Sequence, residues 1–188
     1  MLYTRKGDDG STKTFACDQR ISKSSAVAEA LGTLDEVNSF LGVCKVLSKN
    51  KGLSLGVEKG KFLAFENIVH TIQENLFIVQ AEVAGADKHI SQEKVTEIES
   101  LVDKAEKILP PIKTFFISGG TELAVSFDFA RTLSRRAERR VVAVSEEGKV
   151  NVFPETLSYL NRLSSLLYAL TRLSNHLSGI NEEPPKYA

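Results

Sequence analysis

The sequence predicts an all-α protein, a five-helix bundle preceded by an ordered glycine-rich loop. Three observations lead to this fold class: long segments repeat apolar residues every three or four positions, turn-forming residues separate them, and alternating strand patterns are scarce. The 188 residues, 42% hydrophobic and 26% charged, can bury one core, so we expect a single domain over residues 1–188. It divides into a loop over 1–24, a bundle over 25–179 and a polar, proline-broken tail over 180–188, for which we expect fraying.

The first half of the chain is expected to contain the loop and two helices. Glycine, aspartate and hydroxyl residues from Lys6 to Thr14 favour a loop over a helix. Apolar residues at helical spacing predict a first helix from about Ser24 to Leu47. A connection rich in Lys, Gly and Ser from Lys49 to Gly60 then leads to a second helix from about Phe62 to Val83, whose apolar set includes Leu63 and Phe77.

The second half is expected to contain three helices and one extended piece. A third helix is predicted from Ser91 to Leu109, where two prolines stop it. The segment from Ile112 to Gly120 reads as a short extended piece that ends in a glycine pair. Helix four is predicted from about Thr121 to Ser145, and helix five from about Glu155 to Leu177, with Pro154 suited to its first turn.

Composition and charge argue against several classes of function. With 24 basic and 24 acidic residues, the chain has no overall field that would attract nucleic acid or an anionic membrane. The cysteines Cys17 and Cys44 form no CxxC pair, and His70, His89 and His176 share no ligand spacing, so no zinc site or disulfide framework is expected. The N-terminus lacks a signal-peptide pattern and no stretch approaches about twenty apolar residues, which predicts a cytoplasmic protein.

The most informative segment is helix four, where residues 129–140 contain five arginines and one glutamate. Arg131, Arg135 and Arg139 follow one another at i, i+4 and i+8 and share one helix face with Glu138. One interpretation is a solvated face crossed by ion pairs. Repulsion between stacked guanidinium groups favours the other, a polyphosphate ligand, because guanidinium forks match phosphate oxygens.

Two further polar patterns allow two interpretations each. Asp35 and Asn38 lie in the apolar register of helix one, so the carboxylate either pairs with the arginines or lies on an exposed face. Helix five carries a row of polar residues that forms either the solvent-exposed face of the helix or the wall of an interior polar site. The row consists of Asn161, Ser164, Ser165, Tyr168, Arg172 and Asn175.

At these residues the sequence resembles the PduO-type ATP:cob(I)alamin adenosyltransferases. Five blocks carry the resemblance in order: Tyr3–Gly10, Gly32–Ser39, Phe115–Gly120, Ala130–Arg139 and Tyr159–Ser164. The resemblance implies a homotrimer of five-helix bundles with active sites between subunits. It implies transfer of the 5′-deoxyadenosyl group of ATP to cob(I)alamin, which forms adenosylcobalamin and releases triphosphate.

The resemblance also implies the residues of the site. Residues 1–24 would be the ATP-binding loop, and Mg²⁺ would accompany the ATP. The residues implied to bind ATP are Thr4, Arg5, Lys6, Gly7, Ser11, Thr12, Lys23, Arg135, Arg136, Ala137, Glu138, Arg139 and Asn161. Asp35 would pair with Arg131 to fix helix one against helix four. Phe115 would press on the lower face of the corrin, and Phe115, Arg131, Arg135 and Asp35 would be the catalytic set.

The implied chemistry needs no protein nucleophile or base. Cob(I)alamin attacks the ribose C5′, and Phe115 would exclude the lower axial ligand so that Co(II) becomes four-coordinate and easier to reduce. Charge develops on the departing triphosphate, where arginines and Mg²⁺ can stabilise it. The chain departs from many relatives at Arg5 (usually lysine), Ser118 (usually proline) and Ser165 (usually aspartate).

Two other functions are compatible with the sequence. A non-catalytic protein could bind ATP or adenosylcobalamin as a carrier or sensor for a cobalamin-dependent enzyme. A purely structural bundle could pair its arginines with internal carboxylates. The sequence does not specify the preferred corrinoid, the reductase or the downstream enzyme.

Overall fold

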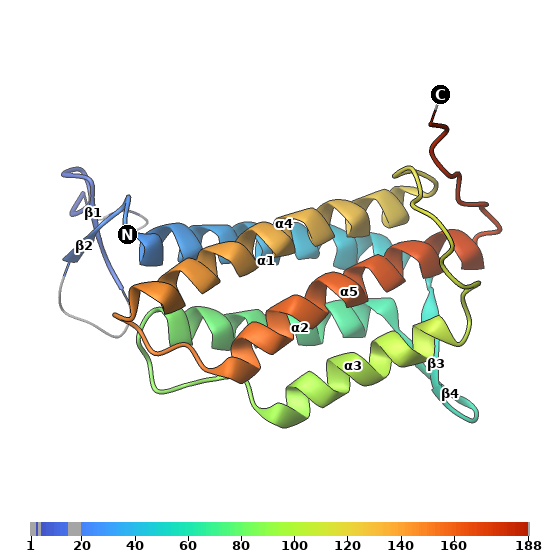
Figure 1. Cartoon of the computed structure of the whole chain (residues 1–188), viewed down its shortest axis with the longest axis horizontal. Coiled ribbons are helices and arrows are strands. Elements are labelled where there is room, and N and C mark those ends of the chain that lie inside the picture. The colour runs from blue at the N-terminus through green and yellow to red at the C-terminus, as the bar shows by residue number, and fades with distance from the viewer. Residues whose placement is uncertain (1–2, 4, 15–19, 188) are drawn as a thin grey trace.

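The computed structural model describes residues 3, 5–14 and 20–187, and within them the chain forms five helices. These are α1 (Ala26–Lys51), α2 (Phe65–Val83), α3 (Gln92–Glu106), α4 (Glu122–Glu147) and α5 (Pro154–Leu177). Figure 1 shows them as one elongated bundle. The predicted all-α class is therefore confirmed.

Local sequence explains where the long helices begin and end. The Ser25 and Thr121 side chains accept hydrogen bonds from the first turns of α1 and α4, as N-cap residues do. Gly52 and Gly148 end the same two helices in the left-handed conformation that glycine adopts without strain. Pro154 occupies the first turn of α5 as predicted.

Helix α4 is the central element of the bundle, because it packs against both α1 and α5, while α1 also packs on α2 and α3 on α5. An apolar stripe along α4 is buried. It includes Phe127, Ala130, Ala137, Val141 and Val144. Burying this stripe leaves the polar side of α4 to face solvent or a ligand.

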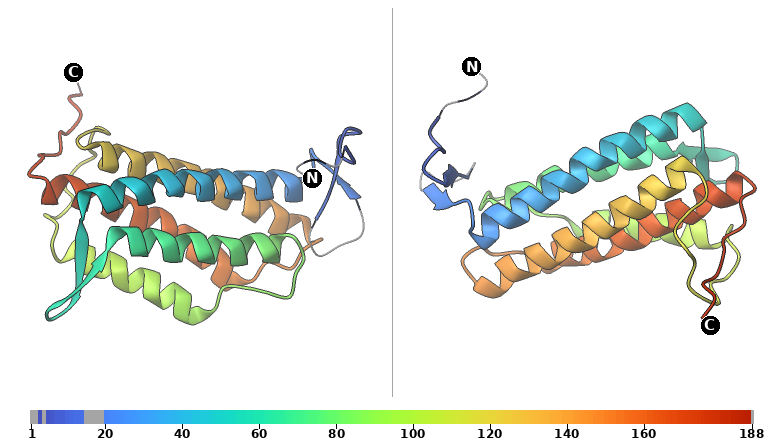
Figure 2. Two further views of the ribbon diagram at one scale, coloured as in Figure 1. Left: turned by 180° about the vertical axis from the view of Figure 1, so that it is seen from behind. Right: turned by 90° about the horizontal axis from the view of Figure 1, so that it is seen from above.

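The connection between the first two helices is not a simple loop, and here the sequence prediction was wrong. A β-hairpin joins β3 (Ser54–Glu58) to antiparallel β4 (Lys61–Ala64), and α2 begins only at Phe65. Leu55 is fully buried and fixes the hairpin to the core. The Lys- and Gly-rich tip projects from the bundle (Figure 2).

Two residues assigned to the apolar set of the second helix behave differently. Leu63 lies on β4, not on α2. Phe77 lies on α2, but its residue is 64% exposed. The apolar face of α2 is therefore narrower than the sequence suggested.

The N-terminus of α5 is held by a buried carboxylate from α2. Glu82 is 2% exposed and accepts hydrogen bonds from the Phe153 backbone N–H at 2.6 Å and the Thr156 hydroxyl at 2.5 Å. A negative charge at this position also complements the helix dipole. Glu82 therefore fixes the direction in which α5 starts.

The tail makes backbone hydrogen bonds near its beginning. The Ile180 N–H donates to the Asn175 carbonyl at 3.0 Å, and the Ile117 N–H donates to the Glu183 carbonyl at 2.8 Å. The first of these bonds closes the C-terminus of α5, and the second joins the tail to the segment before α4.

None of the helices described here has both the length and the apolar character that a membrane crossing demands.

Candidate functional site

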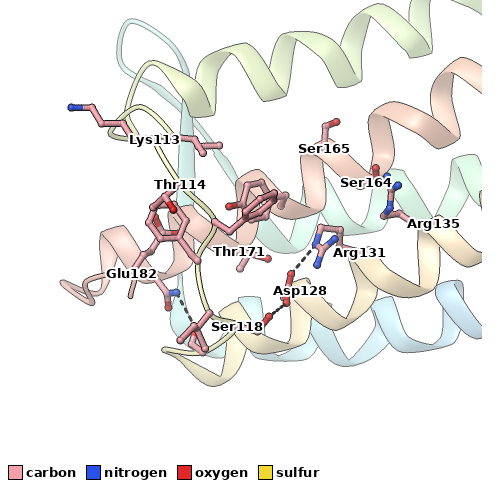
Figure 3. Close-up of a pocket in the computed structure, with 17 residues that line it drawn as sticks. Lys113, Thr114, Ser118, Asp128, Arg131, Arg135, Ser164, Ser165, Thr171 and Glu182 are labelled. Carbon is pink, nitrogen blue, oxygen red and sulfur yellow. Dashed lines mark hydrogen bonds and ion pairs between the residues drawn. The ribbon is translucent and has the colours of Figure 1, made fainter. Parts of the chain in front are cut away.

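An open pocket of about 650 Å³ lies where α4 begins and α5 ends (Figure 3). Its walls come from the segment 112–119, the first half of α4, the second half of α5 and the tail. The lining includes the predicted site residues Phe115, Arg131 and Arg135, and four members of the polar row on α5, namely Ser164, Ser165, Tyr168 and Asn175.

The polar side of the pocket is organised around the buried Asp128 on α4. Its Oδ1 accepts a hydrogen bond from Arg131 Nε at 2.8 Å, and its Oδ2 accepts one from the Ser118 hydroxyl at 2.5 Å. Figure 3 shows the three side chains joined in a row. Asp128 therefore fixes Arg131 and the segment that follows Phe115 at the same time.

This arrangement corrects the predicted pairing of Asp35 with Arg131 within the chain. Asp35 is exposed on α1, while Arg131 is paired with Asp128 three residues earlier on its own helix. Residues three apart on a helix are neighbours, which places Asp128 within reach of Arg131. Sequence analysis missed Asp128, although its spacing from Arg131 was a signal that could have identified it.

Arg135 contributes cationic charge to the pocket. Its residue is exposed, and no carboxylate among the described residues pairs with its guanidinium group. The Arg131 guanidinium lies 5.9 Å from the centre of the Tyr168 ring. Burial raises the pKa of Tyr168 above its ordinary value, and the charges of Arg172 and Arg131 oppose that rise. The phenol is therefore neutral at physiological pH.

Apolar side chains border the same pocket on the segment 112–117. Phe115 is 79% exposed, and Ile112 and Ile117 are more than half exposed. Apolar side chains are seldom left in water in this way unless a ligand or another chain covers them. The pocket thus presents an apolar border and a cationic wall to one ligand space.

The second glycine of the pair before α4, Gly120, is required by a close approach. Gly120 has φ +100°, and a Cβ built there would lie 2.1 Å from Asn175 Oδ1. Asn175 accepts from the Thr121 N–H at 3.0 Å and donates to the Gly119 carbonyl at 3.0 Å. The turn that positions the Phe115 segment is therefore held from α5.

The polar row on α5 is mainly interior. Ser164, Arg172 and Asn175 are buried, so the interior interpretation holds along this part of the helix. Asn161 and Ser165 are exposed, and Ser165 borders the pocket.

The C-terminal half of the arginine helix forms a second polar group. The Asn161 amide donates to Glu138 Oε1 at 2.9 Å, and Arg139 donates to the Arg135 carbonyl at 3.1 Å. Arg136 pairs with Glu36 on α1. Glu138 and Asn161, two of the residues expected to bind ATP, are therefore in contact.

The N-terminal loop is built around its glycines. It folds as β1 (Ser11–Lys13) paired with antiparallel β2 (Arg20–Ser22). Lys23 Nζ donates to the Gly7 carbonyl at 2.8 Å, and a Cβ on Gly7 would lie 3.2 Å from that nitrogen. One small substructure therefore contains five of the residues expected to bind ATP, namely Lys6, Gly7, Ser11, Thr12 and Lys23. Ala137, expected to bind ATP with them, is instead buried on α4.

Two residues that hold this loop together, Asp9 and Arg20, were not identified from the sequence. Arg20 donates to the Lys6 carbonyl and to Ser11 Oγ, the latter at 2.6 Å. Two hydrogen bonds from Ser11 hold the pKa of Asp9 below its ordinary value. Arg5 has φ +59°, a strained conformation for a residue with a side chain and one that often marks a ligand-binding segment. Thr4 lies outside the described residues.

The chain matches known proteins along almost its whole length. The cobalamin adenosyltransferase family model matches residues 2–174. The chain belongs to the cobalamin adenosyltransferase family. It is 38% identical over 182 residues to the corrinoid adenosyltransferase PduO of Citrobacter freundii, a match that covers 93% of this chain and 50% of that protein.

Other members of the cobalamin adenosyltransferase family are similar in size or in structure. The corrinoid adenosyltransferase of Bacillus subtilis is 35% identical over 96% of this chain and 90% of its own length. A variant PduO-type ATP:corrinoid adenosyltransferase from Lactobacillus reuteri, solved in complex with ATP, superposes with a TM-score of 0.84 at 28% identity, covering 98% of this chain and all of the other. The chain spans about half the length of the PduO relatives it matches.

For this member of the cobalamin adenosyltransferase family, the strands β1 and β2 of the loop and the segment 112–119 lie at opposite ends of the bundle (Figures 1 and 2). Arg136 contacts Glu36 on α1, and Ser25, at the start of α1, is 11 residues earlier, which corresponds to about 16 Å along a helix. A triphosphate cannot bridge that separation and reach Phe115 as well. Within one protomer the two predicted halves of the site therefore do not meet.

Magnesium carried by ATP would find oxygen ligands of the right type. Mg²⁺ on a nucleotide needs one or two protein oxygens, because phosphates and water supply the others. The Glu138 carboxylate and the Asn161 amide lie together on the surface beside Arg135 and Arg139. In the described part of the chain no three acidic, histidine or cysteine side chains form a metal cage, which a nucleotide-borne ion does not require.

Proposed function

We propose that the protein transfers the 5′-deoxyadenosyl group of ATP to a reduced corrinoid in sites formed between protomers. The observation that carries this proposal is the pocket in which an exposed Phe115 borders the cationic Arg131 and Arg135. An apolar face and guanidinium groups fit a corrin ring and a triphosphate respectively. Family membership supports the same reaction, and a relative from Lactobacillus reuteri has been solved with both cobalamin and ATP.

The separation between loop and pocket supports the interprotomer arrangement. Each end of the bundle offers half of an ATP site, so a closed ring of subunits would bring the loop of one protomer to the pocket of the next. A homotrimer is the ring that we propose. Asp35 would keep its predicted role only if it reached Arg131 of a neighbouring protomer.

In the proposed reaction the reduced cobalt is a substrate and the nucleophile. The electron pair of the cobalt forms the Co–C5′ bond while the C5′–O bond breaks, and triphosphate leaves with the electron pair of the broken C5′–O bond. No proton moves, so neither a base nor a catalytic triad is needed. Arg135, Arg139 and the loop residue Lys6 would stabilise the charge that collects on the leaving oxygens. Bound Mg²⁺, next to Glu138 and Asn161, would neutralise part of the phosphate charge.

Phe115 would act on the corrinoid rather than on ATP. Its exposed ring can cover the lower face of the corrin and exclude water and an axial ligand. Loss of that ligand leaves four-coordinate Co(II), whose reduction is easier. A separate reductase would supply the electron, and a cobalamin-dependent enzyme in the same cytoplasmic compartment would use the product.

The direct test is anaerobic incubation with MgATP and chemically reduced cobalamin. The proposal predicts a light-sensitive adenosylated product together with triphosphate. Binding of both ligands without product would instead support the alternative function, a carrier or sensor of adenosylcobalamin.

A variant pair tests the phosphate role of the arginine helix. Arg135→Ala should raise the KM for ATP by roughly 10- to 100-fold, because it removes charge-assisted hydrogen bonds, and should leave the fold intact. Arg140→Ala is the matched control, since Arg140 lies on the same helix but faces Glu29 at 3.4 Å. Equal KM values in the two variants would favour the structural bundle over a nucleotide site.

A further inference from the structure

We propose that Arg172 and Glu182 are positioning residues that hold the Phe115 segment in its corrinoid-binding conformation, so that the C-terminal tail controls corrinoid affinity. This inference rests on the proposed function and assigns part of that site to the tail.

Arg172 joins three parts of the chain from a buried position on α5. Its side chain is 5% exposed, and its Nε donates to both carboxylate oxygens of Glu182 at 2.9 and 3.1 Å. Its Nη2 donates to the Pro110 carbonyl at 3.1 Å. The guanidinium group also lies over the Phe116 ring, 5.3 Å from its centre. A single cation therefore holds both the tail and the segment that carries Phe115.

The tail holds the same segment a second time through its backbone. The Ile117 N–H donates to the Glu183 carbonyl at 2.8 Å, so the tail lies alongside residues 115–118 as an extended partner. Glu182 lines the pocket directly, and its side chain is only 18% exposed. The tail is therefore part of the pocket wall, not an appendage beyond it.

The contacts leave the Phe115 ring free while they fix the backbone around it. The segment is held at Pro110, Phe116, Ile117 and Gly119. Phe115 itself is 79% exposed, and among the described residues its ring has no stacking partner. A side chain that must press on a flat ligand benefits from this arrangement, because the backbone is ordered before binding and less entropy is lost on binding.

Charge explains why the tail contributes a glutamate. A buried guanidinium without a carboxylate is strongly unfavourable next to an apolar ligand surface. With Glu182 in place, Arg172 can hold the segment without presenting an unpaired charge to the corrin. Removing Glu182 should therefore loosen the segment rather than simply remove one contact.

The test compares two adjacent glutamates of the tail. Glu182→Ala removes the partner of Arg172, whereas Glu183→Ala removes an exposed side chain and retains the carbonyl that Ile117 uses. We expect Glu182→Ala to raise the KM for the corrinoid about tenfold or more and to change the KM for ATP by no more than about twofold. Both KM values of Glu183→Ala should be close to those of the unaltered protein. Glu182→Gln keeps the shape of the side chain and removes its charge, so its KM for the corrinoid should lie between the values of the two alanine variants. This variant is the control for a folding defect caused by Glu182→Ala.

Hydrogen exchange gives a readout that does not depend on turnover. Added cobalamin should slow exchange of the Ile117 amide in the unaltered protein and in Glu183→Ala, but much less in Glu182→Ala. The inference is overturned if the two alanine variants match in corrinoid KM and in Ile117 exchange, or if Glu182→Ala raises both KM values equally. An inactive unaltered protein would refute the proposed function, and the exchange data would still decide the role of Glu182.

Discussion

Replacing Gly120 by alanine is expected to destabilise the protein by about 3–5 kcal/mol. At φ +100° a residue with a Cβ is strained by about 1–3 kcal/mol. The new Cβ would lie 2.1 Å from Asn175 Oδ1, so the amide must move and give up its hydrogen bonds to Gly119 and Thr121. Two such bonds contribute roughly 2 kcal/mol together.

Gly148→Ala is the matched control for this prediction. Gly148 also has positive φ, at +68°, but a Cβ there meets nothing within 4 Å. Its replacement should cost about 1 kcal/mol, the backbone contribution alone. For a chain of this size the two variants should lower the melting temperature by about 10 °C and about 3 °C respectively.

The assay is urea and thermal unfolding, followed by circular dichroism, of both variants and of Gly120→Ala combined with Asn175→Ala. In the Asn175→Ala background the steric conflict is gone, so Gly120→Ala should cost only about 2 kcal/mol there. The reasoning is refuted if Gly120→Ala and Gly148→Ala are equally stable, or if the double variant shows no coupling.

Three further predictions concern single side chains. Phe115→Ala should raise the KM for the corrinoid about tenfold and leave the melting temperature unchanged, since the ring is 79% exposed; a lower melting temperature would indicate a core role. In a Cys17→Ser background Cys44 should resist alkylation at pH 8, because burial raises the pKa of its thiol from 9.0 to about 12. The free energy of unfolding should fall as the pH rises from 9.0 to about 12, because the Cys44 thiol ionises at a lower pH in the unfolded chain than in the folded protein. Rapid alkylation of Cys44 in the folded protein would contradict this reasoning. Glu82→Gln should lower the free energy of unfolding by about 2 kcal/mol. The control variant Glu147→Gln, at an exposed position, should lower it by less than about 0.5 kcal/mol. Equal losses in the two variants would refute the role of Glu82 at the start of α5.

The helices could be predicted from the sequence because their signals are local. The apolar period of three to four residues, together with Ser25, Thr121 and Pro154 at helix starts, places α1, α4 and α5 within a few residues of their observed limits. The β3–β4 hairpin was missed because its strands are short and its composition is that of a loop. The antiparallel pairing of its strands and the burial of Leu55 in the core distinguish it from one.

The candidate site could be predicted in part. Arginine spacing on α4 identified the cationic wall, because helix geometry alone aligns residues four apart. The partner of Arg131 within the chain, Asp128, lies three residues earlier on the same helix, but this local spacing was overlooked and Asp35 was assigned in its place. Whether the polar row on α5 faced water or the interior could not be decided until the segment 112–119 and the tail were seen to cover it.

The role of Glu182 left no signal in the sequence. A glutamate in a proline-broken tail looks like a solvated residue, and its pairing with Arg172 depends on how the chain returns past the end of α5. Such contacts between segments that are each irregular are the part of a site that local patterns do not encode.

The central claim, that a site joins the loop of one protomer to the pocket of another, is tested most directly by mixing two impaired variants and assaying them at an ATP concentration well below their KM. Lys6→Ala impairs the loop, and Arg135→Ala impairs the pocket. After unfolding and refolding together in equal amounts, about one quarter of the sites should combine two intact halves, so about one quarter of the unaltered adenosylation rate should return. If the mixed protein is no more active than the separate variants, the site lies within one chain and the account is contradicted.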